Sequence, residues 1–247
     1  MLAALEPSQR DFSGGASRDR VELILQSLDR LPTLPAVVAR LLSLTSSNES
    51  SAADVTEVLR ADPALSAGIL KMAQSSQAGI PSSPHLTVQQ AVTLLGFHTV
   101  RNAVLCQQFF DVFQSSTPDR GAQRRELWRH CLAVGCATEW MAKHLGAGIE
   151  PGEAFMCGLL HDVGKLALDT CLPKSYARVV ERTLARDACI CDLEKEILGL
   201  DHMVAGKRLA GRWGLPRSIV ESAWLHHIAP ESLPSAVASP EMISLVH

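Results

Sequence analysis

Residues 155–165 constrain the fold most, because an apolar helical run there ends in two side chains of types that can bind metals. Neighbouring helix positions diverge by about 100°, so His161 and Asp162 do not point the same way. They can still serve one centre if the imidazole binds one ion and the carboxylate reaches across, bridging to a second. Gly164 is expected to bend or end the helix, and Lys165 to place a cation near an anion held by the ions. The alternative is a polar pair that caps a core helix.

Other histidines and one further carboxylate accompany this pair. Glu126 and His130 are four residues apart and share a helix face, while His202 and the pair His226-His227 follow later in the chain. Each lies in or beside a segment with helical apolar spacing. A single histidine on such a face is usually a core residue. Imidazole and carboxylate recurring on four helical segments favour a site for a divalent metal.

With these residues the sequence resembles the HD superfamily of metal-dependent phosphohydrolases, and more closely its HDOD branch of signalling-output domains, which are related to HD-GYP proteins. The residues that match the HD signature in order are His130, His161, Asp162, His202 and His226-His227. The resemblance adds two assignments. Glu126 matches a carboxylate that some HD-GYP proteins place one turn before the first histidine, and Lys165 matches the lysine after the His-Asp pair.

The HDOD part of the resemblance lies earlier in the chain, in residues 31–35 (LPTLP), 60–65 (RADPAL) and 90–96 (QAVTLLG). Together with the HD residues, these motifs cover nearly the whole chain from about residue 20. The resemblance therefore implies an HD-type helical bundle with an N-terminal helical subdomain that carries a partner surface.

Two departures separate the sequence from HD-GYP proteins. After His226-His227 the chain reads Ile228-Ala229-Pro230-Glu231, without the Gly-Tyr-Pro motif that marks hydrolysis of cyclic dinucleotides in that group. The closing aspartate of the HD signature is also absent before the last residue, His247. The resemblance by itself therefore does not imply full catalytic competence.

Composition excludes several classes of protein. The 247 residues suit one large domain or two closely packed subdomains, and 47% hydrophobic residues can build a substantial core. A formal net charge of −3 gives no general attraction to nucleic acid or anionic membranes. The seven cysteines indicate buried thiols of a reducing compartment, and no signal segment or membrane span is evident, so a cytoplasmic protein is expected.

The spacing of apolar residues predicts an all-α fold, because no alternating strand pattern of useful length occurs. Residues 1–19 are expected to be a flexible tail. Residues 20–114 then form an N-terminal helical half, and residues 121–247 form the half that bears the metal ligands. The polar, turn-rich residues 115–121 are the predicted link between the halves.

Helix ends are predicted from capping residues. Thr87 with Gln90 and Ser51 with Asp54 resemble capping boxes. Asp62-Pro63 predicts an N-cap followed by proline at the first helical position, and Gly96 is expected to close a helix. Three further predictions concern loops at residues 46–50 and 79–84, a helix from residue 123 to about residue 145, and structural roles for His85 and His98.

Two ions that share Asp162 would polarise a phosphoryl oxygen and generate hydroxide near neutral pH, with Lys165 pairing with the phosphate. These two residues are the candidate catalytic groups, and one or two ions of iron, manganese or zinc are the candidate cofactors. The favoured function is a non-catalytic or weakly catalytic signalling module that binds partner proteins, because the HDOD motifs lie in both halves and the Gly-Tyr-Pro motif is missing. The alternative is a phosphohydrolase acting on a nucleotide or cyclic dinucleotide. Nucleic-acid binding is disfavoured by the charge and the sparse aromatic residues.

Overall fold

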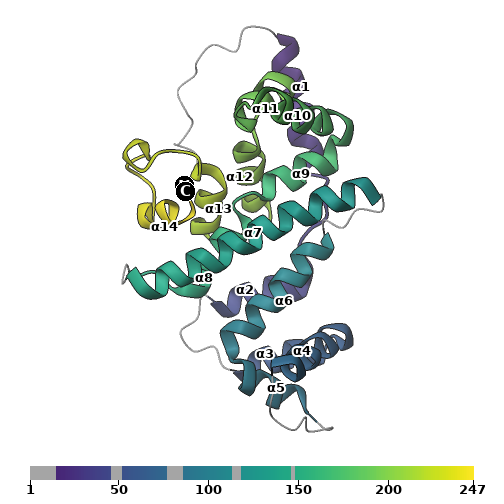
Figure 1. Ribbon diagram of the computed structural model, residues 1–247, viewed down its shortest axis with the longest axis vertical. Helices are drawn as coiled ribbons and strands as arrows, with labels where there is room; N and C mark the ends of the chain where they lie inside the picture. The colour runs from purple at the N-terminus through teal and green to yellow at the C-terminus, as the bar shows by residue number, and fades with distance from the viewer. Residues whose placement is uncertain (1–14, 46–51, 77–85, 113–117, 146–147) are drawn as a thin grey trace. The chain divides into compact units, whose positions relative to one another are not determined.

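A computed structural model describes residues 15–45, 52–76, 86–112, 118–145 and 148–247. Within these ranges the secondary structure is helical and contains no strand, as Figure 1 shows. The all-α prediction is therefore confirmed. None of the described helices is both long enough and apolar enough to cross a lipid bilayer.

The chain forms two compact units, each built from two separate stretches. Unit 1 comprises Met1–Leu31 with Asp162–Gly214, and unit 2 comprises Pro32–His161 with Leu215–His247. The predicted halves are consecutive in sequence, whereas these units interleave along the chain. The division at residues 115–121 stays a prediction about which segments fold independently.

In unit 1, helix α9 packs against both α12 and α10, while α1 contacts α9 and α12. Helix α10 also packs against α11. The helices of unit 1 are α1 (Gly15–Leu28), α9 (Val163–Cys171), α10 (Pro173–Arg186), α11 (Ile190–Leu198) and α12 (His202–Arg212).

In unit 2, the long helix α7 packs along α8, and α13 and α14 contact α8 as well. Helices α3, α4 and α5 pack together and against α6 (Figure 1). The helices of unit 2 are α2 (Ala36–Thr45), α3 (Ala52–Arg60), α4 (Pro63–Ser76), α5 (Val88–Leu95), α6 (Phe97–Val112), α7 (Pro118–Leu145), α8 (Pro151–Leu160), α13 (Arg217–Leu225), the 3₁₀ turn η1 (Pro230–Ser232) and α14 (Pro240–Val246).

Several predicted helix ends are confirmed. The Thr87 side chain accepts a hydrogen bond from the Gln90 N–H, and the Gln90 side chain accepts one from the Thr87 N–H, which completes the capping box. Gly96 ends α5 with φ of 83°, a conformation that favours glycine. Asp62 Oδ1 accepts hydrogen bonds from the N–H groups of Ala64 and Leu65 at the start of α4.

Other boundaries differ from the prediction. Helix α7 begins at Pro118, so residues 118–121 are helical rather than part of a turn. Proline suits the first helical position, where an N–H would have no helical partner. Helix α1 already begins at Gly15. The predicted Ser51 cap, the loops at residues 46–50 and 79–84, and His85 lie outside the described residues.

The prediction that the central helix bends or ends at Gly164 is wrong, because the helix is interrupted earlier, at His161-Asp162, between α8 and α9. Gly164 lies inside α9 and serves close packing instead. A Cβ atom added to it would lie 1.9 Å from the backbone oxygen of His202, so only glycine allows α9 and α12 to approach this closely.

Candidate metal centre

Unit 2 brings together histidines from three helices. His130 lies in α7, while His161 and His226 directly follow the last residues of α8 and α13. His130 Nε2 lies 3.2 Å from His161 Nε2, and the ring centroids of His161 and His226 are 5.0 Å apart. The His227 ring lies 4.3 Å from that of His226. His161 and His226 are buried, and His130 and His227 are exposed.

Two of these imidazoles are oriented by the carbonyl groups of their own helices. His161 Nδ1 lies 2.7 Å from the oxygen of Gly158, and His226 Nδ1 lies 3.1 Å from that of Ser222. A carbonyl oxygen has two lone pairs and only accepts hydrogen bonds, so each neutral ring carries its proton on Nδ1. The lone pair then lies on Nε2, which is the nitrogen a metal would take.

Unit 1 holds a second cluster, which is more deeply buried. Asp162 is 1% exposed and His202 is 0% exposed. Asp162 Oδ1 lies 3.4 Å from His202 Nε2, and its Oδ2 accepts a hydrogen bond of 2.8 Å from Lys165 Nζ. His202 is the first residue of α12, where the Asp201 side chain caps the helix by accepting from the N–H of Val204 at 2.9 Å.

The sequence interpretation missed two buried residues beside His202. The Glu194 carboxylate, which is 0% exposed, accepts hydrogen bonds from His202 Nδ1 at 2.6 Å and from the backbone N–H of His202 at 2.8 Å. Tyr176 donates its hydroxyl to the other oxygen of Glu194 at 3.0 Å. Burial, followed by the nearby charge of Glu194, raises the pKa of Tyr176 well above its ordinary value.

A signal for Glu194 was present in the sequence. Cys191 and Leu198 lie three residues before and four residues after it, so all three share one helix face. Both neighbours are buried hydrophobic residues, and burial raises the pKa of the Cys191 thiol to about 12. A carboxylate between such neighbours is predicted to be buried, and a buried carboxylate needs partners.

Not all predicted ligands lie in a cluster. The Glu126 side chain is 77% exposed and lies 3.4 Å from Arg129 on the same helix. Its role as a metal ligand stays a prediction. His98, expected to be structural, is exposed and lies 3.7 Å from Glu150.

The donor atoms fit a divalent metal. With Nδ1 protonated, His202 presents the lone pair of Nε2 towards Asp162 Oδ1, and two acceptors at 3.4 Å are compatible with a cation that contacts both. The Nε2 atoms of His130 and His161, 3.2 Å apart, are a second close pair of ligand-type atoms. Imidazole nitrogen and carboxylate oxygen are ligands that zinc, iron and manganese accept. His161 and Asp162 are consecutive, so the peptide bond itself joins the two clusters.

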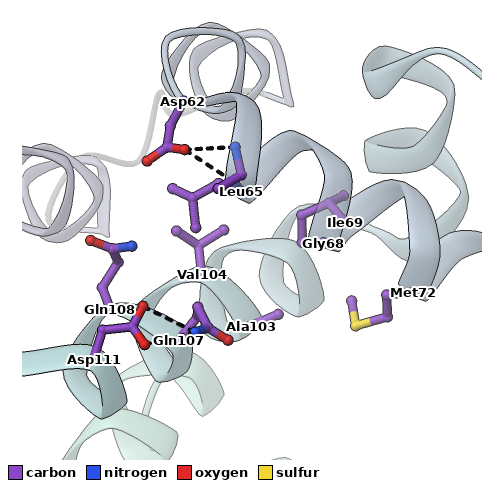
Figure 2. Close-up of a pocket in the computed structure, with 11 residues that line it drawn as sticks. Asp62, Leu65, Gly68, Ile69, Met72, Ala103, Val104, Gln107, Gln108 and Asp111 are labelled. Carbon is purple, nitrogen blue, oxygen red and sulfur yellow. Dashed lines mark hydrogen bonds between the residues drawn. The ribbon is translucent and has the colours of Figure 1, made fainter. Parts of the chain in front are cut away.

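Unit 2 also carries a groove of about 420 Å³ between α4 and α6. The small residues Gly68 and Ala103 line it, and a Cβ atom on Gly68 would meet no atom within 4 Å. In Figure 2, Asp62 and Asp111 lie at one end and Met72 at the other. The groove thus combines an apolar floor with an acidic end.

Comparisons with known proteins agree with this fold. A solved HDOD domain protein of unknown function from Geobacter sulfurreducens shares 25% identity and a TM-score of 0.77, covering 94% of this chain and 75% of that one. A protein of Shewanella amazonensis SB2B, named as a proposed phosphohydrolase, shares 29% identity and a TM-score of 0.70, covering 90% of this chain and 77% of that one.

A protein of Treponema pallidum (strain Nichols), named only as uncharacterized, is 23% identical over 209 residues. The match covers 85% of this chain, which spans 40% of the length of that curated relative. The family model of the HDOD domain matches residues 31–229. This match includes both histidine clusters and most of the described helices, so the chain belongs to the HDOD domain family.

Proposed function

We propose that this chain is an HDOD-type regulatory module that holds a His/Asp metal centre and acts by binding partner proteins. The observation that carries the proposal is the placement of His161 and Asp162. Both side chains are buried, each lies among ligand-type atoms of its own unit, and the two residues are joined by one peptide bond.

The ligand set of the proposed centre is His130, His161, Asp162, His202 and His226, with Glu126 and His227 as outer candidates. One or two ions of iron, manganese or zinc suit these donors. Such an ion, when bound, supplies Lewis-acid polarisation and lowers the pKa of a bound water. Lys165 holds the second oxygen of Asp162 at 2.8 Å, so the carboxylate keeps one orientation towards His202.

Two features favour a regulatory role over hydrolysis. The segment after His226-His227 forms the 3₁₀ turn Pro230–Ser232, in place of the Gly-Tyr-Pro motif that accompanies hydrolysis of cyclic dinucleotides in HD-GYP proteins. The groove between α4 and α6 supports partner binding, because its apolar floor and the acidic groups Asp62 and Asp111 suit an apolar side chain flanked by basic ones.

A phosphohydrolase is the second candidate. The ligand types support it, and so does the similarity to the Shewanella amazonensis protein named as a proposed phosphohydrolase. In that case Asp162 would be a ligand to the ions, and Lys165, which donates to Asp162 Oδ2 at 2.8 Å, would supply positive charge for a substrate phosphate.

Elemental analysis and turnover together test the proposal. Protein grown with iron, manganese and zinc should contain at least one of these metals, and the Asp162→Ala variant should contain less. Metal-loaded protein should hydrolyse cyclic dinucleotides and simple phosphoesters very slowly or not at all. Rapid turnover that Asp162→Ala abolishes would establish the phosphohydrolase instead. Wild-type protein without metal would refute the metal centre.

A further inference from the structure

We infer that Glu194 is a positioning residue for the metal ligand His202, so that the correct nitrogen of the imidazole faces the metal. This inference rests on the proposed metal centre and assigns a role to a residue outside its ligand set. Glu194 lies in α11, eight residues before His202, and both side chains are fully buried.

The contacts of the carboxylate determine the imidazole tautomer. An ionised carboxylate only accepts hydrogen bonds, so the 2.6 Å contact of Glu194 Oε2 places the proton on His202 Nδ1. The same oxygen accepts the backbone N–H of His202 at 2.8 Å, which fixes the ring relative to the first turn of α12. His202 Nε2 is then the lone-pair nitrogen, and it is the atom 3.4 Å from Asp162.

Tyr176 holds the carboxylate itself in place. Its hydroxyl donates to Glu194 Oε1 at 3.0 Å, so Tyr176, Glu194 and His202 form a buried chain of hydrogen bonds from α10 through α11 to α12. A carboxylate that accepts from the ring nitrogen not bound to the metal also makes the imidazole a more basic ligand. Losing such a partner lowers metal affinity about 10–100-fold.

A direct metal site at Glu194 is the competing interpretation, because ligand atoms of Cys191, Glu194 and His202 all lie within 4.8 Å of one another. The geometry favours the positioning role. A nitrogen and an oxygen that are each bound to a metal at about 2.0–2.2 Å, near tetrahedral angles, lie more than 3 Å apart. The 2.6 Å separation of His202 Nδ1 and Glu194 Oε2 is that of a hydrogen bond.

The test is the affinity of the purified full chain for Zn²⁺, measured by competition with a chelator. Glu194→Gln should weaken Zn²⁺ binding about 10–100-fold. The control is Glu196→Gln on the same helix, since Glu196 is exposed and lies near Arg182 and Arg186. This control should bind Zn²⁺ like the wild type. Far-UV circular dichroism of the metal-free variants should match that of the wild type.

A double substitution separates positioning from a general structural effect. If Glu194 acts through His202, Glu194→Gln should not weaken Zn²⁺ binding further in a His202→Ala background. An equal further loss in that background would overturn the inference. Wild-type affinity of the single variant Glu194→Gln for Zn²⁺ would also overturn the inference. A wild type that binds no Zn²⁺, iron or manganese would instead refute the proposed function, and the inference with it.

The tautomer provides a readout that does not depend on the fold of a variant. In the metal-free wild type, ¹⁵N NMR of the imidazole rings should show His202 protonated at Nδ1. Protonation at Nε2 alone would contradict the inference, because the Glu194 contact would then not select the metal-binding nitrogen.

Discussion

The two histidine clusters orient their imidazoles by different means. In unit 2, His161 and His226 follow the last residues of helices, and their Nδ1 atoms face carbonyl groups of those helices. In unit 1, His202 is the first residue of a helix, and its Nδ1 faces the Glu194 carboxylate. Near a helix C-terminus, carbonyl groups can accept from a side chain, whereas the backbone groups left open at a helix N-terminus are N–H donors. For His202, at the start of α12, the acceptor is a side chain of another helix.

This difference has a practical consequence. The carbonyl acceptors of unit 2 belong to the backbone and cannot be removed by substitution, but the acceptor in unit 1 can. The clusters also differ in exposure, since His130 and His227 are exposed while Asp162, Glu194 and His202 are buried. Unit 1 is thus where the orientation of a ligand can be tested separately from its presence.

The largest expected effect comes from removing one ligand from each cluster. His161→Ala and His202→Ala should each lower metal affinity by more than the about 10–100-fold that an outer partner contributes. The far-UV helical signal of His161→Ala should persist, because the caps and apolar faces of residues 31–96 do not involve the ligands. Elemental analysis measures the bound metal, and circular dichroism measures the helical signal. Loss of metal in His161→Ala but not in His202→Ala would show that only the cluster of unit 2 binds metal.

A smaller effect is expected from replacing glycine by alanine where two helices are in close contact. An added Cβ would lie 1.9 Å from the His202 oxygen at Gly164, and 2.5 Å from Thr138 Oγ1 at Gly158. Gly164→Ala should lower the free energy of unfolding by about 3 kcal/mol or more. Gly158→Ala should lower it by less, about 1–3 kcal/mol, because the nearest backbone atoms there belong to Gly135 and lie farther away, at 2.8 Å and 2.9 Å.

Gly211 is the control for these substitutions. It lies on α12, and a Cβ atom there meets nothing within 4 Å. Gly211→Ala should leave stability unchanged or raise it by about 0.5–1 kcal/mol. Urea unfolding of the three variants gives the comparison. Equal stability of Gly164→Ala and Gly211→Ala would contradict the close packing of α9 on α12.

The smallest effect concerns Tyr176, the only tyrosine of the chain. Its raised pKa means that the unfolded chain loses this proton first, at about pH 10. The stability that the neutral hydroxyl contributes is therefore present below about pH 10 and is lost as the pH rises further. Between pH 10 and pH 11, Tyr176→Phe should lose about 1 kcal/mol less stability than the wild type.

Tyrosinate absorbance of the wild type follows this single residue. It should appear together with unfolding rather than before it. Tyrosinate formation in the folded protein near pH 10 would show that Tyr176 is not buried against Glu194.

Helix ends were predictable where a few neighbouring residues decide them. The Thr87–Gln90 box, the Asp62-Pro63 start and the Gly96 stop were all evident from spacing, and all three are confirmed. The start of α7 was placed too late, because polar and proline residues at its beginning resemble a turn. Such residues suit both a turn and a first helical turn, so local sequence does not distinguish them.

The sequence by itself determined the all-α class, the family, and the position of His161 and Asp162 at the end of a buried helix. These depend on apolar period and local motifs. Only the tertiary structure revealed that Glu194 faces His202, that Tyr176 supports Glu194, and that Gly164 admits the backbone of α12. Each of these is a contact between different helices. The 3.6-residue period of a helix fixes which of its residues share a face. It does not fix which other helix that face packs against.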